Sequence, residues 1–498
     1  MKSVDSAAVT ETHIGVVVFV GDRAYKLKKP VNLGFLDFST RELRARACHR
    51  EVELNRRFAP DVYLGVSDVL GPDGRVCDHL VVMRRMPADR RLATLVRDGA
   101  PVADALRDTA RIVASWHARA PRDAAISAQG TRDALRARWN DSFQQVRPFH
   151  GEVIAAETAA EIEELAAEFL AGREPLFDAR IAGGRVVDGH GDLLANDVFC
   201  LDDGPRILDC LEFDDELRSL DGLDDASFLA MDLERLDAPE LAERFITWYA
   251  EFAADPAPPS LRHHYTGYRA FVRAKVACLR HAQGDPDAAA EARAYAAIAL
   301  RHLRAGRVGL ILVGGLPGTG KSTLAGALAD RLGCSLLSSD RTRKELAGLA
   351  PLDPAAAPYN TGIYTQEWDG RTYHELADRA AKLLRQGETV ILDASWTSKE
   401  HRDLLAATAE REHAALSSLR CEAPETLTLE RIRNRTGNAS DADSAIAAAM
   451  RAHAAPWPEA TTIDAAGALT DAIAQALTVI RPHGAQHLWP RRPTLSPD

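Results

Sequence analysis

The residues best placed to do chemistry lie in the stretch from Val308 to Thr323, VGLILVGGLPGTGKST. Glycines let backbone N–H groups turn inward around phosphate oxygens, a lysine can reach the β- and γ-phosphates, and the hydroxyl after it can ligate Mg²⁺. The pattern G-x-x-x-x-G-K-[ST] is met in full here, so we predict a site for ATP and Mg²⁺. The residues expected to contact the nucleotide are Gly315, Leu316, Pro317, Gly318, Thr319, Gly320, Lys321, Ser322 and Thr323.

Two carboxylates follow this loop, each after an apolar run. Asp340 ends CSLLSSD, with Arg343 three residues later, and Asp393 ends VILD. Asp340 could accept a proton from an attacking hydroxyl while Arg343 orients an anionic part of the acceptor. Asp393 has the form of a Walker B carboxylate, which acts on the metal or its water shell. Capping of a helix would select similar residues at both places.

Two arginines further on, Arg431 and Arg435, fall four residues apart on one face of a predicted helix. In that position they could form a lid that neutralises charge in the transition state, and we predict that they contact ATP. The alternative is an ordinary exposed helix face, where arginines are common.

A second set of charged residues lies near the N-terminus. In AYKLKKPV, period-two alternation places Lys26 and Lys28 on one face of a predicted strand, and Glu51 follows in a segment with helical spacing. Two lysines on one face indicate an anionic partner. For Lys26 and Glu51 alone, however, a solvated surface is the better explanation.

Short strands are predicted over residues 198–201 and 207–211, in and just after HGDLLANDVFCLDDGPRILDC. Acidic side chains fall near the ends of such strand-like pieces, at Asp192, Asp197 and Asp209. Such a set could hold Mg²⁺ on oxygen ligands and accept a proton from a hydroxyl nucleophile. An acidic surface hairpin would account for the same pattern.

The elements that must position these groups differ along the chain. Residues 1–86 are rich in predicted strands, residues 87–305 in alanine-rich helical patterns, and residues 306–498 alternate strand and helix. A chain of 498 residues is too long for one compact core. We therefore predict two domains, residues 1–305 with a β lobe and a helical lobe, and residues 306–498.

Composition restricts the classes of function. The formal charge of −11 disfavours a general binder of nucleic acid or anionic membranes. No apolar run reaches the length of a membrane span, and the N-terminus lacks the features of a signal peptide. The seven cysteines form no C-x-x-C pair, which favours reduced thiols and a cytoplasmic protein.

HGDLLANDVF and ILDC, together with AYKLKKP and SWHARAP, resemble the aminoglycoside phosphotransferase-like branch of the protein-kinase fold. The resemblance covers most of residues 1 to about 300 and implies an α+β bilobal domain. It implies that Asp192 is the catalytic base, that Asp209 binds Mg²⁺, and that Lys26 paired with Glu51 holds the ATP phosphates.

The chain departs from that family in two places. The metal-binding asparagine is expected five residues after Asp192, where this chain has Asp197, with Asn196 one residue earlier. Either residue could be the metal ligand. No G-x-G-x-x-G loop precedes Lys26, so the domain is either an active phosphotransferase or a degenerate regulatory domain.

Residues 308 to about 480 resemble the small P-loop kinases grouped with zeta toxins, gluconate kinases and the kinase domain of polynucleotide kinase. This implies a three-layer α/β domain with a parallel sheet, Asp340 as general base and Arg343 as a substrate-positioning residue. The whole chain resembles two-headed proteins that fuse both domains, and its alanine- and arginine-rich composition suits a high-GC actinobacterium such as a mycobacterium.

These inferences predict a phosphotransferase that moves the γ-phosphoryl group of ATP to a hydroxyl of a small polar metabolite, of the sugar or aminoglycoside kind. The C-terminal head is the stronger candidate for catalysis. Two alternatives stay open: an ATP-binding regulatory or stress-response protein, and a kinase of polynucleotide 5′ ends, which the negative charge disfavours. The sequence does not identify the acceptor or the oligomeric state.

Overall fold

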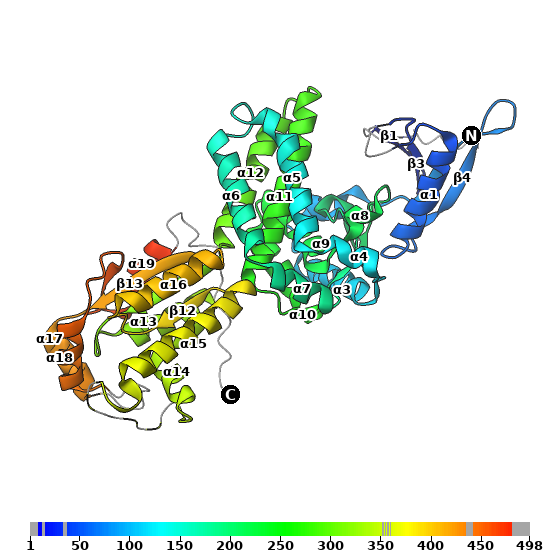
Figure 1. Ribbon diagram of the computed structural model, residues 1–498. Helices are drawn as coiled ribbons and strands as arrows, with labels where there is room; N and C mark the ends of the chain where they lie inside the picture. The colour runs from blue at the N-terminus through cyan, green and yellow to red at the C-terminus, as the bar shows by residue number, and fades with distance from the viewer. Residues whose placement is uncertain are drawn as a thin grey trace. The chain divides into compact units, whose positions relative to one another are not determined.

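The computed structural model describes residues 8–11, 15–32, 37–350, 353, 355, 358, 360–434 and 442–480. Its contacts divide the chain into two units (Figure 1). Unit 1 comprises Met1–Ala159, Phe177–Ala257 and Tyr265–Ala299, and unit 2 comprises Ala160–Leu176, Pro258–His264 and Leu300–Asp498. The boundary expected near residue 305 stays a prediction.

Unit 1 begins with a five-stranded antiparallel sheet in the order β1-β2-β3-β5-β4. A long helix, α1 (Arg41–Asn55), packs against β4 and β5 and buries Cys48 and Val52 against the sheet. The side chain of Thr40 caps this helix by accepting from the N–H of Leu43. The strands are β1 (Ala8–Glu11), β2 (Gly15–Val20), β3 (Arg23–Lys28), β4 (Tyr63–Leu70) and β5 (Val76–Arg84).

The rest of unit 1 is mainly helical and carries two short antiparallel strand pairs, β6 with β9 and β7 with β8. Helix α10 packs on both α3 and α9. The strands are β6 (Val186–Asp188), β7 (Val198–Leu201), β8 (Gly204–Ile207) and β9 (Ser219–Asp221). Its helices are α2 (Leu92–Arg97), α3 (Ala103–Arg119), α4 (Ala124–Gln129), α5 (Arg132–Val146), α8 (Asp215–Arg218), α9 (Gly222–Arg235) and α10 (Pro239–Phe252). Four further helices are divided between the two units: α6 (Ala156–Ala171), α7 (Glu174–Ala182), α11 (Pro259–Ala282) and α12 (Ala288–Ala305).

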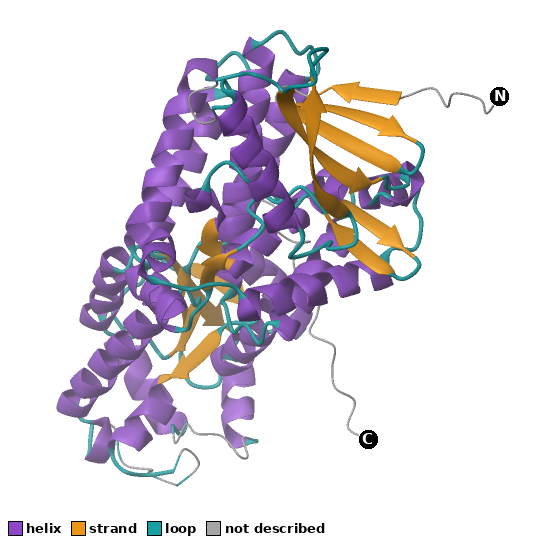
Figure 2. Ribbon diagram, turned by 90° about the vertical axis from the view of Figure 1, so that its right-hand side faces the viewer, coloured by secondary structure: helices purple, strands orange, loops and turns teal. Residues whose placement is uncertain are grey.

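Unit 2 is built on a five-stranded parallel sheet in the order β11-β12-β10-β13-β14, drawn in orange in Figure 2. Its strands are β10 (Gly309–Gly314), β11 (Ser335–Ser338), β12 (Val390–Asp393), β13 (Ala415–Glu422) and β14 (Thr461–Asp464). Its helices are α13 (Lys321–Leu332), α14 (Ser339–Leu346), α15 (Gln366–Arg385), α16 (Lys399–Arg411), α17 (Glu425–Arg433), α18 (Ser444–His453) and α19 (Leu469–Ile480).

Helices cover both faces of the parallel sheet. Ile311 and Val313 of β10 share a core with Leu324 and Leu328 of α13 and with Ala476 of α19. Helix α15 packs on both α14 and α16, and it also contacts β10, β11 and β12. Because the central strands β10 and β12 are buried on both faces, they read as apolar runs, the pattern that identified these two strands in the sequence.

The predicted fold class is confirmed. Unit 1 joins an antiparallel-sheet lobe to a helical lobe, and unit 2 contains a three-layer α/β domain with a parallel sheet. In the part of the chain that the structure describes, no helix is both long and apolar enough to span a membrane.

Candidate functional sites

The P-loop connects β10 to α13, and its backbone depends on glycine. Gly315, Gly318 and Gly320 have φ angles of 141°, 81° and 94°. A Cβ atom on Gly318 would lie 2.5 Å from the carbonyl oxygen of Thr428, so a larger residue would shift the loop. The positive φ angles and the close approach of backbone together explain why the sequence places glycines here.

Lys321 and Ser322 begin α13, directly beside the end of β12. Asp393 is the last residue of β12, pairs in register with Val313 of β10, and hydrogen-bonds to the Ser322 side chain. It is only 6% exposed, and burial raises the pKa of Asp393 while the charge of Lys321 opposes the rise. The structure therefore brings together the lysine, the hydroxyl and the carboxylate expected from the sequence.

The Oδ1 atom of Asp393 is buried and accepts no hydrogen bond from the described residues. A buried, unpaired carboxylate oxygen beside the Ser322 hydroxyl fits a divalent cation such as Mg²⁺. Among the described residues, no group of three or more histidine, cysteine or acidic side chains could hold a metal alone. Mg²⁺ commonly takes one or two protein ligands and completes its shell with phosphate oxygens and water.

A pocket with a volume of about 140 Å³ opens beside the P-loop, and both Lys321 and Asp340 line it. Asp340 lies in the first turn of α14, because β11 ends at Ser338 and the helix begins at Ser339. The expectation that Asp340 ends the strand is therefore wrong by two residues. An acidic residue in this first turn also interacts favourably with the helix dipole, so the position suits both a base and a helix-stabilising role.

Arg343 also lines this pocket but is already engaged. Its side chain is buried, and Nη1 donates to Asp369 Oδ1 at 2.6 Å and to the carbonyl of Ile363 at 3.2 Å. The guanidinium group lies over the ring of Tyr364. Sequence reasoning missed Asp369, because it belongs to no motif and reaches Arg343 only through packing of α15 on α14.

Arg431 of α17 lies beside the P-loop. Its Nη2 donates to the carbonyl of Ala465 at 3.0 Å, and Nη1 is 3.4 Å from the point where a Cβ on Gly320 would stand. Arg431 therefore lies against the P-loop, and its contact with ATP stays a prediction. Arg435 lies outside the described residues.

In unit 1, Lys26 of β3 forms ion pairs with Glu51 of α1 and with Asp209. Its Nζ lies 2.9 Å from Glu51 Oε1 and 2.7 Å from Asp209 Oδ1. Although burial acts to lower it, the pKa of Lys26 is raised well above its usual value by the charges of Asp209 and Glu51. These three residues thus form the lysine–glutamate–aspartate constellation that the kinase resemblance implies.

A second lysine supports this constellation. Lys28 is 2% exposed, and its Nζ lies 2.8 Å from Glu51 Oε2 and 2.5 Å from Glu212 Oε1. Alternation along the strand had placed Lys28 on the same face as Lys26, but no motif identified Glu212 as its partner. Glu51 therefore pairs with both lysines, which fixes its carboxylate beside Lys26.

Asp209 has a left-handed backbone conformation, with φ of 65°. Its N–H donates to the Tyr63 hydroxyl at 3.1 Å, and the next N–H, of Cys210, donates to Asn55 Oδ1 at 2.9 Å. The charge of Lys26 lowers the pKa of Asp209 against the effect of burial. Strand β8 ends at Ile207, so the predicted strand over residues 207–211 is wrong, and this bonded turn takes its place.

The other acidic candidates lie near Asp209. Burial raises the pKa of Asp192, and burial followed by the charges of Asp209 and Asp192 raises the pKa of Asp197 well above its usual value. Asp197 is half-buried, whereas its neighbour Asn196 is exposed. Of the two candidate metal ligands, Asn196 and Asp197, it is therefore Asp197 that lies close to the carboxylates of Asp192 and Asp209.

The loop that carries Asp192 is fixed by buried hydrogen bonds. The Asp225 carboxylate accepts from the N–H groups of His190 and Gly191 at 2.7 and 2.9 Å, and its Oδ2 lies 3.0 Å from His117 Nε2. His190 Nε2 lies 3.0 Å from the carbonyl of Leu208, which links this loop to the strand before Asp209.

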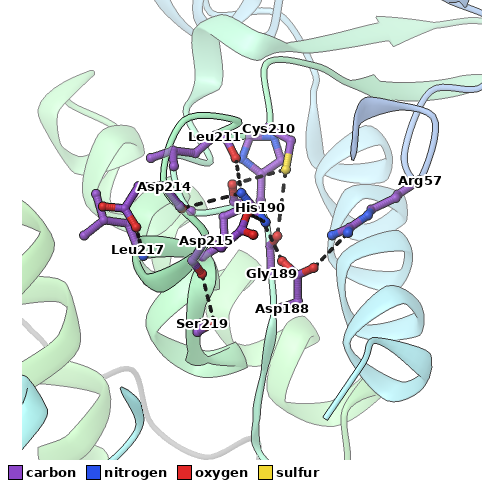
Figure 3. A network of polar contacts seen from close by, with 12 residues as sticks. Arg57, Asp188, Gly189, His190, Cys210, Leu211, Asp214, Asp215, Leu217 and Ser219 are labelled. Atoms are coloured by element: carbon purple, nitrogen blue, oxygen red, sulfur yellow. Dashed lines mark hydrogen bonds and ion pairs between the residues drawn. The ribbon is translucent and has the colours of Figure 1, made fainter. Parts of the chain in front are cut away.

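A neighbouring ion pair anchors the strand that leads into this loop. Figure 3 shows Arg57 reaching Asp188, and its Nη2 donates to Asp188 Oδ2 at 2.8 Å. Arg218 donates to the other oxygen of Asp188 at 2.9 Å. Among the basic residues of α11, Arg269 is occupied by a bidentate pair with Asp224 at 2.6 Å, which makes it part of the buried support.

Replacing Asp225 by asparagine should destabilise unit 1 in a pH-dependent way. The pKa of Asp225 is lowered to about 2, against the effect of burial, chiefly by its hydrogen bond to His117 and by the nearby histidine charges. A lowered pKa stabilises the fold above the unfolded value near 3.8, and this contribution is lost as pH falls through about 2. We expect Asp225→Asn to cost about 2–4 kcal/mol at pH 7.

Urea unfolding between pH 7 and pH 2 would test this, with the exposed Asp178→Asn as control. The difference in the free energy of unfolding between wild type and Asp225→Asn should become smaller below about pH 4. A constant difference across the range would contradict the assigned role of the carboxylate.

Comparisons with known proteins found chains that are similar to this one. Over 473 residues, 95% of this chain and 95% of theirs, the chain is 44% identical to uncharacterized proteins of Mycobacterium tuberculosis (Rv2004c) and Mycobacterium bovis (Mb2027c). A family model described as an AAA domain matches residues 310–457, the part that holds the P-loop. The C-terminal unit therefore contains a nucleotide-binding P-loop domain.

Solved structures of kinases are similar to parts of the chain. A sugar kinase from Janibacter sp. is 20% identical with a TM-score of 0.28, covering 35% of this chain and 94% of that one. A gluconokinase from Sinorhizobium meliloti is 21% identical with a TM-score of 0.25, covering 35% and 91%. A choline/ethanolamine kinase family protein from Mesorhizobium loti is 14% identical with a TM-score of 0.39, covering 61% and 94%.

Proposed function

The chain belongs to the family of the mycobacterial proteins Rv2004c and Mb2027c, and from its own sites we propose that it is an ATP- and Mg²⁺-dependent phosphotransferase. The proposed acceptor is a hydroxyl group of a small polar metabolite, and the P-loop head is the proposed catalytic centre. One observation carries the proposal: Lys321, which would hold the phosphates, and Asp340, which would accept the proton, line the same pocket.

The chain's own groups divide the work of the reaction. The P-loop N–H groups and Lys321 would hold the β- and γ-phosphates, and Asp340 would orient the acceptor hydroxyl and take its proton. Ser322 and Asp393 would hold Mg²⁺, which when bound neutralises phosphate charge. The bond between the γ-phosphorus and the bridging oxygen breaks as the acceptor oxygen bonds to phosphorus, giving ADP and a phosphate monoester.

The N-terminal head is proposed as a second ATP site. Lys26, aligned by Glu51, would hold the phosphates, Asp209 and Asp197 would hold Mg²⁺, and Asp192 would be the base. The ion pairs of Lys26 at 2.7 and 2.9 Å support this assignment.

A binding-only, regulatory N-terminal head is the second candidate. It is favoured by the extra negative charge at Asp197 and by the two-residue turn at Gly21 and Asp22, where a longer glycine-rich loop would be needed to cover phosphates.

The proposed setting is the cytoplasm, with ATP and a small-molecule acceptor as the partners. The net charge of −11 does not favour nucleic acid as the acceptor, because binding to a phosphate backbone relies on basic groups. Incubation of the full chain with ATP, Mg²⁺ and a pooled metabolite and aminoglycoside extract, followed by mass spectrometry, tests the proposal. Absence of any phosphorylated product would contradict it.

Asp192→Ala separates the two candidates for the N-terminal head. If Asp192 is a catalytic base, this variant should form one product about 10²–10⁴ times more slowly and leave the product of the P-loop head unchanged. The exposed Asp98→Ala is the matched control. A full set of products at wild-type rates would assign the N-terminal head to binding alone.

A further inference from the structure

The pocket beside the P-loop contains a second carboxylate that no motif identified. Asp369, near the start of α15, accepts from Arg343 Nη1 at 2.6 Å, and its own side chain is 39% exposed. Arg343 in turn is only 6% exposed at its side chain and is also bonded to the carbonyl of Ile363. The positive charge of Arg343 is thus matched within the pocket by a protein carboxylate.

The other titratable groups add no positive charge at neutral pH. His401 stacks on Tyr373 with ring centroids 3.9 Å apart, and burial lowers the pKa of His401. The titratable groups that face His401 are Asp369, Glu400, His374 and Arg343. Burial raises the pKa of Tyr373 to about 12, so the Tyr373 hydroxyl stays protonated and uncharged.

With Lys321 assigned to the nucleotide, the described lining residues carry two carboxylates, Asp340 and Asp369, and one guanidinium, Arg343. Besides Tyr364, Tyr373 and His401, the remaining polar lining among the described residues consists of neutral side chains that form hydrogen bonds. These are Ser339, Asn360, Ser395, Thr397 and Ser398. Hydroxyl and amide groups of this kind exchange hydrogen bonds with sugar hydroxyls, and carboxylates accept from hydroxyl and ammonium groups.

We infer that the acceptor of the P-loop head is an uncharged or cationic polyhydroxylated molecule, and that Asp369 is the residue that excludes acidic sugars by neutralising Arg343. The inference rests on the proposed function and names its substrate class. It differs from the expectation that Arg343 orients an anionic part of the acceptor. A carboxylate or phosphate on the acceptor would have to displace Asp369 from Arg343 and lie near Asp340, both of which are unfavourable.

The test uses the full-length protein with ATP, Mg²⁺ and a panel of matched acceptors: neutral hexoses and hexitols, the corresponding amino sugars, and the corresponding aldonic and uronic acids. ADP release and mass spectrometry give kcat/KM for each member. For wild type we expect the best neutral or amino member to exceed its acidic counterpart at least tenfold. In Asp369→Asn the ratio of kcat/KM for the neutral or amino sugar to that for the acid should fall at least tenfold, because the amide no longer neutralises Arg343.

Asp378→Asn is the matched control, since Asp378 lies on the same helix but is exposed and does not line the pocket. It should leave the ratio unchanged. A wild-type preference for the acids, or an unchanged ratio in Asp369→Asn, would overturn the inference while leaving phosphoryl transfer intact. Failure of every panel member to react overturns the inference too, and turnover of the metabolite extract then decides whether the proposed function survives.

Discussion

Replacing Lys321 by alanine is expected to lower phosphoryl transfer by the P-loop head about 10³-fold or more. Lys321 begins α13 and lines the acceptor pocket. Its positive charge acts to lower the pKa of Asp393, against the effect of burial. Its ammonium group would contact the oxygens on which negative charge changes during transfer, and removal of one such group typically costs a factor of 10² to 10³ or more. ADP release and product mass in the presence of an accepted metabolite would measure the loss.

The exposed Lys382→Ala on α15 is the control, because it removes the same kind of charge away from the loop. Thermal unfolding of both variants would show whether the fold is retained. If Lys321→Ala keeps more than a tenth of wild-type turnover while Asp192→Ala loses it, catalysis belongs to the N-terminal head. If neither change affects turnover, the assignment of both sites is wrong.

The P-loop could be predicted from sequence because all its parts are local. Strand, glycines, lysine and hydroxyl follow one another within sixteen residues, and each has a distinct physical reason to be there. Asp393 was found for a related reason, since a buried strand that ends in a carboxylate is a recognisable pattern. The closeness of Ser322 to Asp393 follows from the parallel pairing of β12 with β10, because Asp393 ends β12 and Ser322 comes soon after the paired end of β10.

Contacts between distant segments could not be predicted in this way. The pair of Arg343 with Asp369 and the pair of Lys28 with Glu212 join residues 26 and 184 positions apart, and neither belongs to a repeated spacing. Glu51 was linked to Lys26 only through the kinase resemblance. These pairs are decided by tertiary packing, which side-chain periodicity does not encode.

Strand ends were also misplaced, for a local reason. At the end of β11, Ser338 keeps an extended backbone while Ser339 already starts α14, so two polar residues assigned to the strand belong to the helix. After β8, the left-handed conformation of Asp209 interrupts the extended backbone. Both departures lie next to candidate catalytic carboxylates, where backbone turns orient side chains at the expense of regular structure.

Asp340→Asn is expected to lower kcat of the P-loop head about 10²–10⁴-fold, with little change in the KM for ATP. Asparagine has nearly the same shape as aspartate but cannot take a proton from the acceptor hydroxyl at neutral pH. The substitution also keeps a polar side chain in the first turn of α14, so the local fold should survive. Initial rates with the best acceptor at saturating ATP would measure the effect.

Glu345→Gln on the same helix is the matched control, because its carboxylate is exposed and pairs with Arg379 outside the pocket. The two possible roles of Asp340, as a base or as a helix-stabilising residue, predict different results for Asp340→Asn. If Asp340 serves only the helix, Asp340→Asn should shift the melting temperature as Glu345→Gln does and leave kcat within a factor of two. A large loss of kcat at an unchanged melting temperature would mean that the carboxylate acts on the acceptor, which is the role the shared pocket with Lys321 predicts.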